Sequence, residues 1–131
     1  MIRRLIRNEQ GAAVIEMAFA LPVLIIMMWA LVQFGLVFRA MSGIQHGLGE
    51  GARYATLYPQ PDASLIKSKI GATVYGIGPG DFTIENPVSG TADGADYLDL
   101  TVTYKQDTDL LVLPGPTIEV SRSKRVWVST S

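Results

Sequence analysis

A long hydrophobic run dominates the first third of the chain. From Met17 to Phe38 the only strongly polar side chain is Gln33. A helix over this run would measure roughly 33 Å at about 1.5 Å per residue, which is enough to cross a bilayer. Pro22 lies inside the run and has no N–H to donate to the carbonyl of Ala18, so it either kinks the helix or is simply tolerated there.

The helical pattern continues beyond the apolar run, over residues 39–57. Small residues recur at every fourth position in this part: Gly43, Gly47, Gly51 and Ala55. A neighbouring row is formed by Ala40, Ile44, Leu48 and Ala52. Small residues at this spacing allow a second backbone to approach closely. The partner is either another subunit or the chain's own sheet, and Pro59 and Pro61 end the helix.

A second, shorter helix is predicted over residues 63–76, with Asp62 as its N-cap. Ile66, Ile70 and Val74 are spaced four apart and mark its apolar stripe. The glycine-rich stretch at residues 76–81 follows as a turn. It precedes a strand and has no Lys-Ser/Thr pair, which excludes a phosphate-binding loop.

Alternating hydrophobic and polar residues predict strands in the last third of the chain. Over residues 97–105, one face carries Leu98, Leu100, Val102 and Tyr104. Residues 81–85 and 117–121 alternate in the same way, and residues 126–131 either extend the last strand or pair with it. We expect an α+β fold, in which helix 39–57 covers an antiparallel meander of three or four strands.

The connection at residues 109–116, DLLVLPGP, is unusually apolar. We expect Leu111 and Leu113 to pack into the core. In the alternative, residues 110–113 contact a partner or the membrane surface.

Length and charge restrict the function. A membrane span leaves about 75 to 90 of the 131 residues for a domain in water, which excludes a large catalytic domain. The net charge of -1 provides no basic field for nucleic acid. Arg3, Arg4 and Arg7 precede the apolar run, so the N-terminus is expected in the cytoplasm and the C-terminal part on the other side of the membrane.

Candidate chemistry is sparse. His46 has no cysteine or second histidine to complete a metal site and is expected to be a surface or packing residue. Asp93, Asp96 and Asp99 lack EF-hand spacing, which leaves calcium binding as a minor alternative. We therefore expect neither a catalytic site nor a cofactor.

Glu16 is the exception within the apolar region. A charge in hydrocarbon costs at least about 2.5 kcal/mol, and such residues usually have a partner. If the chain were cut after Gly11, Ala12 would acquire a positive amine one helical turn from Glu16. Glu16 would then pair with that amine, or with the amine of an adjacent subunit.

Four features follow one another in the first part of the chain: Gly11 with Glu16 five residues later, ALPVL, QFG and EGARYA. With these motifs in order, residues 8–57 resemble the TadE-like minor pilins, or pseudopilins, of the Tad (type IVc, Flp) pilus system. The resemblance implies a type IV pilin-like fold with a leader peptide at 1–11, a transmembrane and extended helix at 12–58 and an exported α+β domain at 59–131. Met17 stands where major pilins of this system commonly have Tyr, which favours a minor component.

The same resemblance implies cleavage after Gly11 by a prepilin peptidase and a role in assembling a pilus used for adhesion. Its expected partners are other minor pilins, the major Flp-type pilin and an inner-membrane assembly platform. Cleavage would change the side-chain charge from 11 - 12 = -1 to 8 - 11 = -3. The loss of basic residues would ease extraction of the helix from the lipid bilayer.

Two alternatives stay open. One is a permanently anchored, single-span envelope protein that acts as a periplasmic binding module and keeps residues 1–11. The other is a secreted domain released by signal peptidase, although signal peptides usually have a shorter apolar core, of about 7 to 15 residues.

Overall fold

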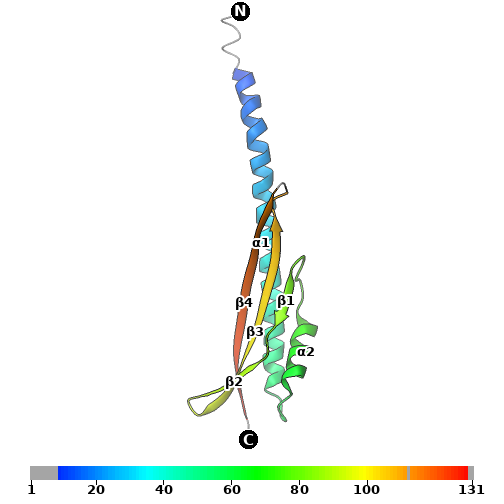
Figure 1. The fold of residues 1–131 in the computed structure, drawn as a ribbon, viewed down its shortest axis with the longest axis vertical. Coiled ribbons are helices and arrows are strands. Elements are labelled where there is room, and N and C mark those ends of the chain that lie inside the picture. Colours follow the sequence, from blue (N-terminus) through cyan, green and yellow to red (C-terminus); the bar gives the residue numbers. More distant parts are fainter. Residues whose placement is uncertain (1–8, 112, 130–131) are drawn as a thin grey trace, which may run out of the picture.

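The computed structural model describes residues 9–111 and 113–129. A single helix, α1 (Glu9–Ala55), runs almost the full length of the molecule (Figure 1). It passes through Pro22 without a break. Turns follow Ala55 and lead to Pro59, so the helix ends where the two prolines were expected to end it. The basic residues Arg3, Arg4 and Arg7 lie outside the described residues.

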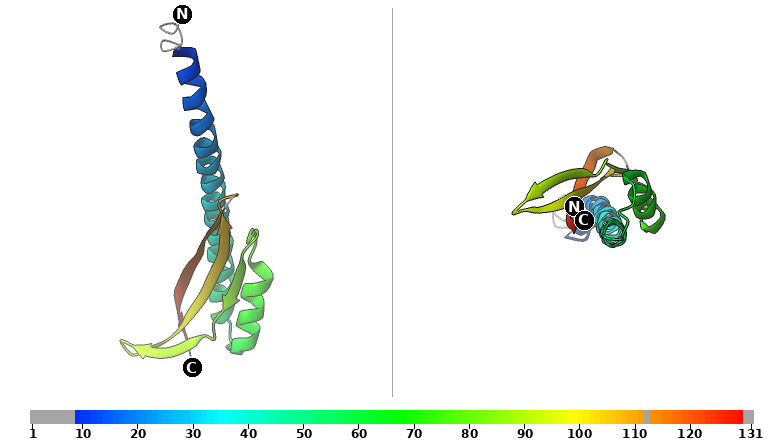
Figure 2. Two further views of the ribbon diagram at one scale, coloured as in Figure 1. Left: turned by 45° about the horizontal axis from the view of Figure 1, so that its top comes forward. Right: turned by 90° about the horizontal axis from the view of Figure 1, so that it is seen from below.

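The second helix, α2 (Ala63–Thr73), packs beside the C-terminal part of α1 (Figure 2). Ile66 and Ile70 are buried, as their spacing predicted. The expected side-chain cap is absent, because Asp62 contributes only its backbone carbonyl, which accepts from the N–H groups of Leu65 and Ile66. The following turn places Gly76 and Gly78 at positive φ, which glycine adopts readily.

Four antiparallel strands form one sheet: β1 (Asp81–Ile84), β2 (Val88–Ala92), β3 (Ala95–Asp109) and β4 (Pro114–Val128). The strands β1, β3 and β4 pair in chain order, as the predicted meander requires. The strand β2, which was not predicted, pairs with the first part of β3, so β1 and β2 lie along the same edge of β3. The strand β4 includes both predicted segments, 117–121 and 126–128, as one continuous strand, while residues 130–131 lie outside the described residues.

The core lies between α1 and the sheet. Leu98, Leu100, Val102 and Tyr104 are all buried, which confirms the alternation seen in the sequence. Opposite them lie the buried residues of the row Ala40, Ile44, Leu48 and Ala52 on α1. The helix therefore covers the sheet as expected, and the α+β fold is confirmed.

The loop of the β3–β4 hairpin differs from expectation. Leu111 and Leu113 are 54% and 64% exposed, so the prediction that they pack into the core is wrong. The hairpin extends along α1 toward its N-terminal half, beyond the core (Figure 1). Its loop therefore lies beside the apolar part of the helix, and Val112 lies outside the described residues.

Candidate functional site

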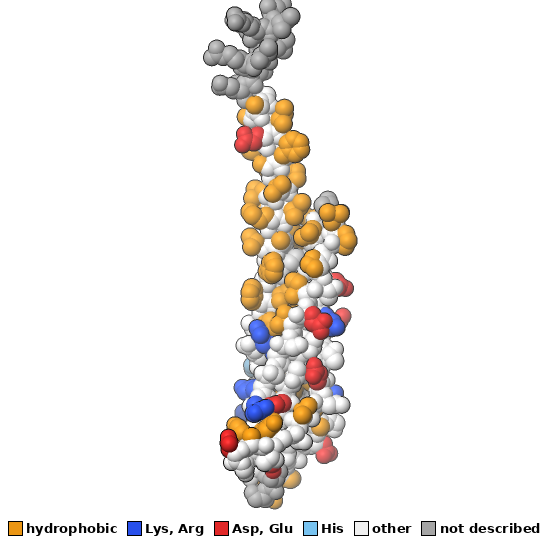
Figure 3. Space-filling view, turned by 60° about the vertical axis from the view of Figure 1, so that its left-hand side comes forward, with side chains coloured by type: hydrophobic (Ala, Val, Ile, Leu, Met, Phe, Trp, Pro, Cys, Tyr) orange, Lys and Arg blue, Asp and Glu red, His pale blue; other side chains and the backbone are white. Residues whose placement is uncertain are grey.

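The N-terminal part of α1 projects away from the rest of the protein. We call residues 11–28 the free segment, since most of their side chains are exposed, including Val14 at 70% and Phe19 at 75%. Figure 3 shows hydrophobic side chains over this part of the molecule, whereas charged ones gather mainly on the domain. The helix is long and apolar enough to cross a membrane, with a mean hydropathy of 2.3 in its best window, and is a candidate membrane anchor.

Glu16 lies in the free segment and is exposed. Within residues 9–111 and 113–129 it makes no hydrogen bond and no ion pair. Ala12 lies one helical turn before it, on the same face of α1. Gly11 and Ala12 are also exposed and belong to α1. The pairing of Glu16 with a new amine at Ala12 stays a prediction.

Gln33 ties the helix to the β3–β4 hairpin. It is only 9% exposed. Its Oε1 accepts from Nε2 of Gln106 at 2.9 Å, and its Nε2 donates to the carbonyl of Asp109 at 3.4 Å. Nε1 of Trp29 donates to the Asp109 carboxylate at 3.0 Å. We call Trp29, Gln33, Gln106 and Asp109 the polar clasp, because it fastens the hairpin to α1 at the base of the free segment.

The hydroxyl of Tyr104 extends the polar clasp into the core. It lies 2.7 Å from Oε1 of Gln106 and 2.7 Å from the carbonyl of Ile77, and it donates its single proton to either oxygen. Burial raises the pKa of Tyr104, and the nearby Asp81 carboxylate raises it further, while a hydrogen bond with the backbone of Gly80 partly opposes both. Tyr104 therefore remains a neutral donor at neutral pH. In the described part of the chain, no buried side-chain nitrogen or oxygen lacks a hydrogen-bond partner.

The predicted small-residue row faces α2 and the segment after it. A methyl group added at Gly43 would collide with the carbonyl oxygen of Tyr75, and one at Gly47 would lie 2.6 Å from Cγ2 of Val74. A methyl group at Gly51 would collide with the side chain of Ile70. Ala55 is buried in the core. The row therefore packs inside this chain, against the second helix and not against the sheet.

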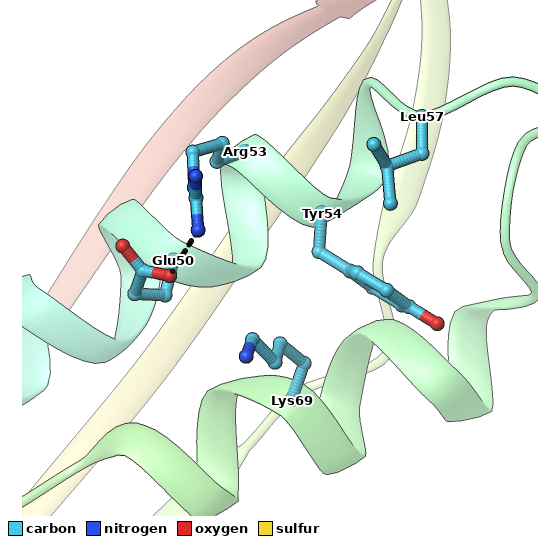
Figure 4. Close-up of a pocket in the computed structure, with 5 residues that line it drawn as sticks. All are labelled: Glu50, Arg53, Tyr54, Leu57 and Lys69. Atoms are coloured by element: carbon cyan, nitrogen blue, oxygen red, sulfur yellow. Dashed lines mark hydrogen bonds and ion pairs between the residues drawn. The ribbon is translucent and has the colours of Figure 1, made fainter.

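A small cleft lies between α1 and α2 (Figure 4). Its volume is about 170 Å³, and its lining consists of Glu50, Arg53, Tyr54, Leu57 and Lys69. Glu50 and Arg53 form an ion pair at 3.1 Å across one turn of α1. These five residues combine an ordinary surface ion pair with apolar side chains, and the set indicates no particular ligand.

The candidate metal residues are dispersed. His46 is exposed, and its ring centre lies 5.6 Å from that of Tyr75, which fits the expected packing role. Asp93 lies in the β2–β3 turn at φ 52°, whereas the Asp96 carboxylate accepts from the Thr91 hydroxyl at 2.7 Å. Within residues 9–111 and 113–129, no three His, Cys, Asp or Glu residues are arranged to hold a metal ion.

Asp99 belongs to a cluster on the outer face of the sheet. Its carboxylate accepts two hydrogen bonds from Arg125, at 2.8 and 2.7 Å. The guanidinium lies 3.8 Å from the centre of the Tyr97 ring, and Trp127 packs edge-on against Tyr97. The hydrogen bonds from Arg125 lower the pKa of Asp99. This cluster joins β3 to β4 across the outward face.

The comparison with protein-family models finds a similarity within α1. Residues 11–53 match the family model described as TadE-like protein. These 43 of the 131 residues are similar to the TadE-like family. The TadE-like family is a structural, non-enzymatic group associated with Tad pili. No curated protein and no solved structure matches the chain.

The TadE-like region ends before the sheet begins. It contains Gly11, Glu16 and Gln33, whereas Gln106 and Asp109 lie outside it. The polar clasp therefore joins a TadE-like residue to residues beyond the family match. One feature of the sequence indicated this contact, because Gln33 is the only strongly polar residue in an apolar run and would need a hydrogen-bond partner when buried. Nothing in the periodicity identified Gln106 as that partner.

Proposed function

We propose that this chain is a minor pilin, or pseudopilin, which takes part in assembling a Tad (type IVc, Flp) pilus used for surface adhesion. It would be made as a prepilin in the inner membrane, with its N-terminus in the cytoplasm. A prepilin peptidase would cleave it after Gly11. Other minor pilins, the major Flp-type pilin and the inner-membrane assembly platform would then bind it.

Glu16 carries the proposal. An exposed carboxylate on an apolar helix is unfavourable in a membrane unless a positive charge lies nearby. Cleavage after Gly11 would create an amine on Ala12, one turn away on the same face of α1. Glu16 would pair with that amine, or with the amine of a neighbouring subunit, and so hold adjacent helices in register.

The direct test is the intact mass and N-terminal residue of the protein isolated from its host. We expect a chain that begins at Ala12. Gly11→Val should block cleavage and leave Met1 in place. Gly35→Ala is the control, because Gly35 also lies on the apolar helix and a methyl group added there would have no atom within 4 Å, as at Gly11; this variant should be cleaved normally. A functional protein that retains Met1 would instead support the permanently anchored binding module.

A second test separates membrane insertion from assembly. Glu16→Gln removes the charge at nearly constant shape, so insertion should be unchanged or improved, since a buried carboxylate costs at least about 2.5 kcal/mol. Assembly, measured as pili sheared from cells, should decrease strongly. Glu16→Asp keeps the charge and should retain more pili than Glu16→Gln. Normal pilus yield with Glu16→Gln would contradict the charge pairing.

A further inference from the structure

The β3–β4 loop and the membrane anchor lie at the same level. Trp29 of α1 donates to Asp109 at 3.0 Å, at the point where β3 ends and the loop begins. The apolar stretch of α1 extends from Gly11 to Phe38 and contains one ionisable residue, Glu16. A hydrocarbon core about 30 Å thick takes up about 20 helical residues. Every such window between Gly11 and Phe38 contains Trp29.

The β3–β4 hairpin reaches the same depth as Trp29. Wherever the bilayer lies on the apolar stretch, Trp29 is at membrane depth, and so is the loop bonded to it. Asp107 and the Lys105–Glu119 ion pair lie a short way down the same strands. Those charges favour the position at which the hairpin enters the bilayer least, with the bilayer edge close to Trp29. Tryptophan is also enriched at that edge.

The side chains of the loop suit a lipid environment. Residues 110–118 carry no charge. Leu111 and Leu113 are more than half exposed, and the hydrophobic surface continues from α1 onto this end of the hairpin (Figure 3). Burial of an exposed leucine side chain away from water is favourable. Two exposed leucines next to an apolar helix therefore extend the surface that lipid would cover.

Backbone N–H groups of the loop also form hydrogen bonds within the protein, which an environment without water requires. The N–H of Leu110 donates to the carbonyl of Leu113 at 2.8 Å, and the N–H of Leu111 donates to the Asp109 carboxylate at 3.0 Å. Pro114 and Pro116 have no N–H to satisfy. Oδ1 of the Asp109 carboxylate accepts from both Trp29 and Leu111, so two protein donors replace water at this oxygen. An unsatisfied group would be expensive in lipid, and these donors are satisfied.

We propose that the β3–β4 loop is a second membrane contact, which inserts Leu111 and Leu113 into the interfacial layer of the leaflet from which α1 leaves the bilayer. The ligand is the lipid itself. The anchor then has two points, a spanning helix and a loop fastened to it, which fixes both the depth of α1 and the rotation of the domain about it. This proposal needs only a membrane-spanning α1 and does not depend on the pilin function.

The test uses the complete protein in vesicles of phosphatidylethanolamine and phosphatidylglycerol at high lipid-to-protein ratio. The chain has no cysteine, so single spin labels are unambiguous. Labels are placed with Leu113→Cys and Leu111→Cys. Ala95→Cys is the control, because Ala95 is exposed at the other end of β3. Collision rates with oxygen, which concentrates in lipid, and with a water-soluble nickel complex give the depth of each label.

In the vesicles we expect the labels at 111 and 113 to collide more often with oxygen and less often with nickel than the label at 95, which stays accessible to nickel. Nickel accessibility at 111 and 113 equal to that at 95 would overturn the proposal. Labels shielded from both reagents, and released on dilution with lipid, would also overturn it, because a second protein copy would then cover the loop.

Discussion

At the scale of single residues, Gln33 shows how a polar side chain in an apolar helix becomes a structural contact. It is buried and bonded to Gln106 and to the carbonyl of Asp109. The net stabilisation from such a bond is small, but a buried amide left without its partner costs about 1 to 3 kcal/mol. The polar clasp is therefore sensitive to the loss of one partner and tolerant to the loss of both.

A double-mutant cycle tests this asymmetry. Gln106→Leu should lower the free energy of unfolding by about 1 to 3 kcal/mol, because the Gln33 amide is left unsatisfied. Combining it with Gln33→Leu should restore most of the loss. The free energy is measured by denaturant titration of the complete protein in detergent, followed by near-UV circular dichroism. Losses that simply add would show that the two glutamines act independently.

Asp99 gives a pH-dependent prediction. Arg125 lowers the pKa of its carboxyl in the folded protein, so the ionised form stabilises the fold above the unfolded pKa of about 3.9. That stabilisation is lost as the pH falls through the lower, folded pKa. Asp99→Asn should therefore melt at a slightly lower temperature than wild type at pH 6, with the gap closing under strong acid.

Arg125→Lys is the control for the Asp99 experiment. Lysine retains the positive charge but loses the two parallel hydrogen bonds. Its melting temperature should lie between those of wild type and Asp99→Asn at pH 6. A gap between wild type and Asp99→Asn that does not change with pH would remove the ion pair as its cause.

At the scale of elements, α1 is packed on two sides, by the sheet and by α2. The two contacts use different rows of the helix: larger apolar residues meet the sheet, and glycines meet α2. Because Gly43 lies against the backbone of Tyr75, no side-chain movement can make room for a methyl group there. The separation between the helices is therefore set by the absence of side chains.

Two glycine substitutions on α1 should have opposite signs. Gly43→Ala should lower the free energy of unfolding by about 1 to 3 kcal/mol through overpacking. Gly49→Ala should raise it by roughly 1 kcal/mol, because alanine is the better helix former and no atom lies near the added methyl group. Both are measured by denaturant titration in detergent. Equal effects would mean that helix propensity, and not the contact with α2, decides the outcome.

The sequence predicted the elements better than their contacts. The alternation over residues 97–105 gave the central strand and its buried face, since period two leaves one solution when one side is buried. The short strand β2 was missed, because Val88–Ala92 contains Ser, Gly and Thr and lacks a hydrophobic alternation. Its pairing depends on the Asp93-Gly94 turn, where both residues have positive φ.

For the predicted site residues as well, the sequence indicated a role more readily than the contact partner. The packing role of Gly43, Gly47 and Gly51 was visible from their spacing, but spacing alone did not identify α2 as the partner. The exposure of Leu111 and Leu113 was not predictable from hydrophobicity, which favoured the core. Their position follows from the length of the hairpin beside α1, a property of the whole sheet.

At the scale of the whole molecule, the protein consists of a free segment and a domain that share one helix. The core begins at Val37, and the first contacts with the hairpin are at Trp29 and Gln33. The described residues before Trp29 add little to the packing of the domain. The stability of the domain should therefore not depend on them.

Two truncations test this division. A chain that begins at Trp29 should melt, in mild detergent, close to the temperature of the complete protein. A chain that begins at Ala40 loses Val37 and the helix side of the polar clasp. It should be less stable by several kcal/mol, since burial of one valine contributes about 1.5 to 3 kcal/mol and the broken amide contact a similar amount. Equal melting temperatures for the two truncations would show that neither Val37 nor the polar clasp contributes to the stability of the domain.

The polar clasp also has a mechanical consequence. The hairpin lies lengthwise beside α1 (Figure 1), and the contacts at Trp29 and Gln33 connect the two near the end of the hairpin. A pull on the N-terminal end of α1 acts along the axis of this contact, so it loads these hydrogen bonds together in shear and does not open them one after another. Tension on the helix is thus transmitted directly to the sheet, and the domain moves with its helix as one body.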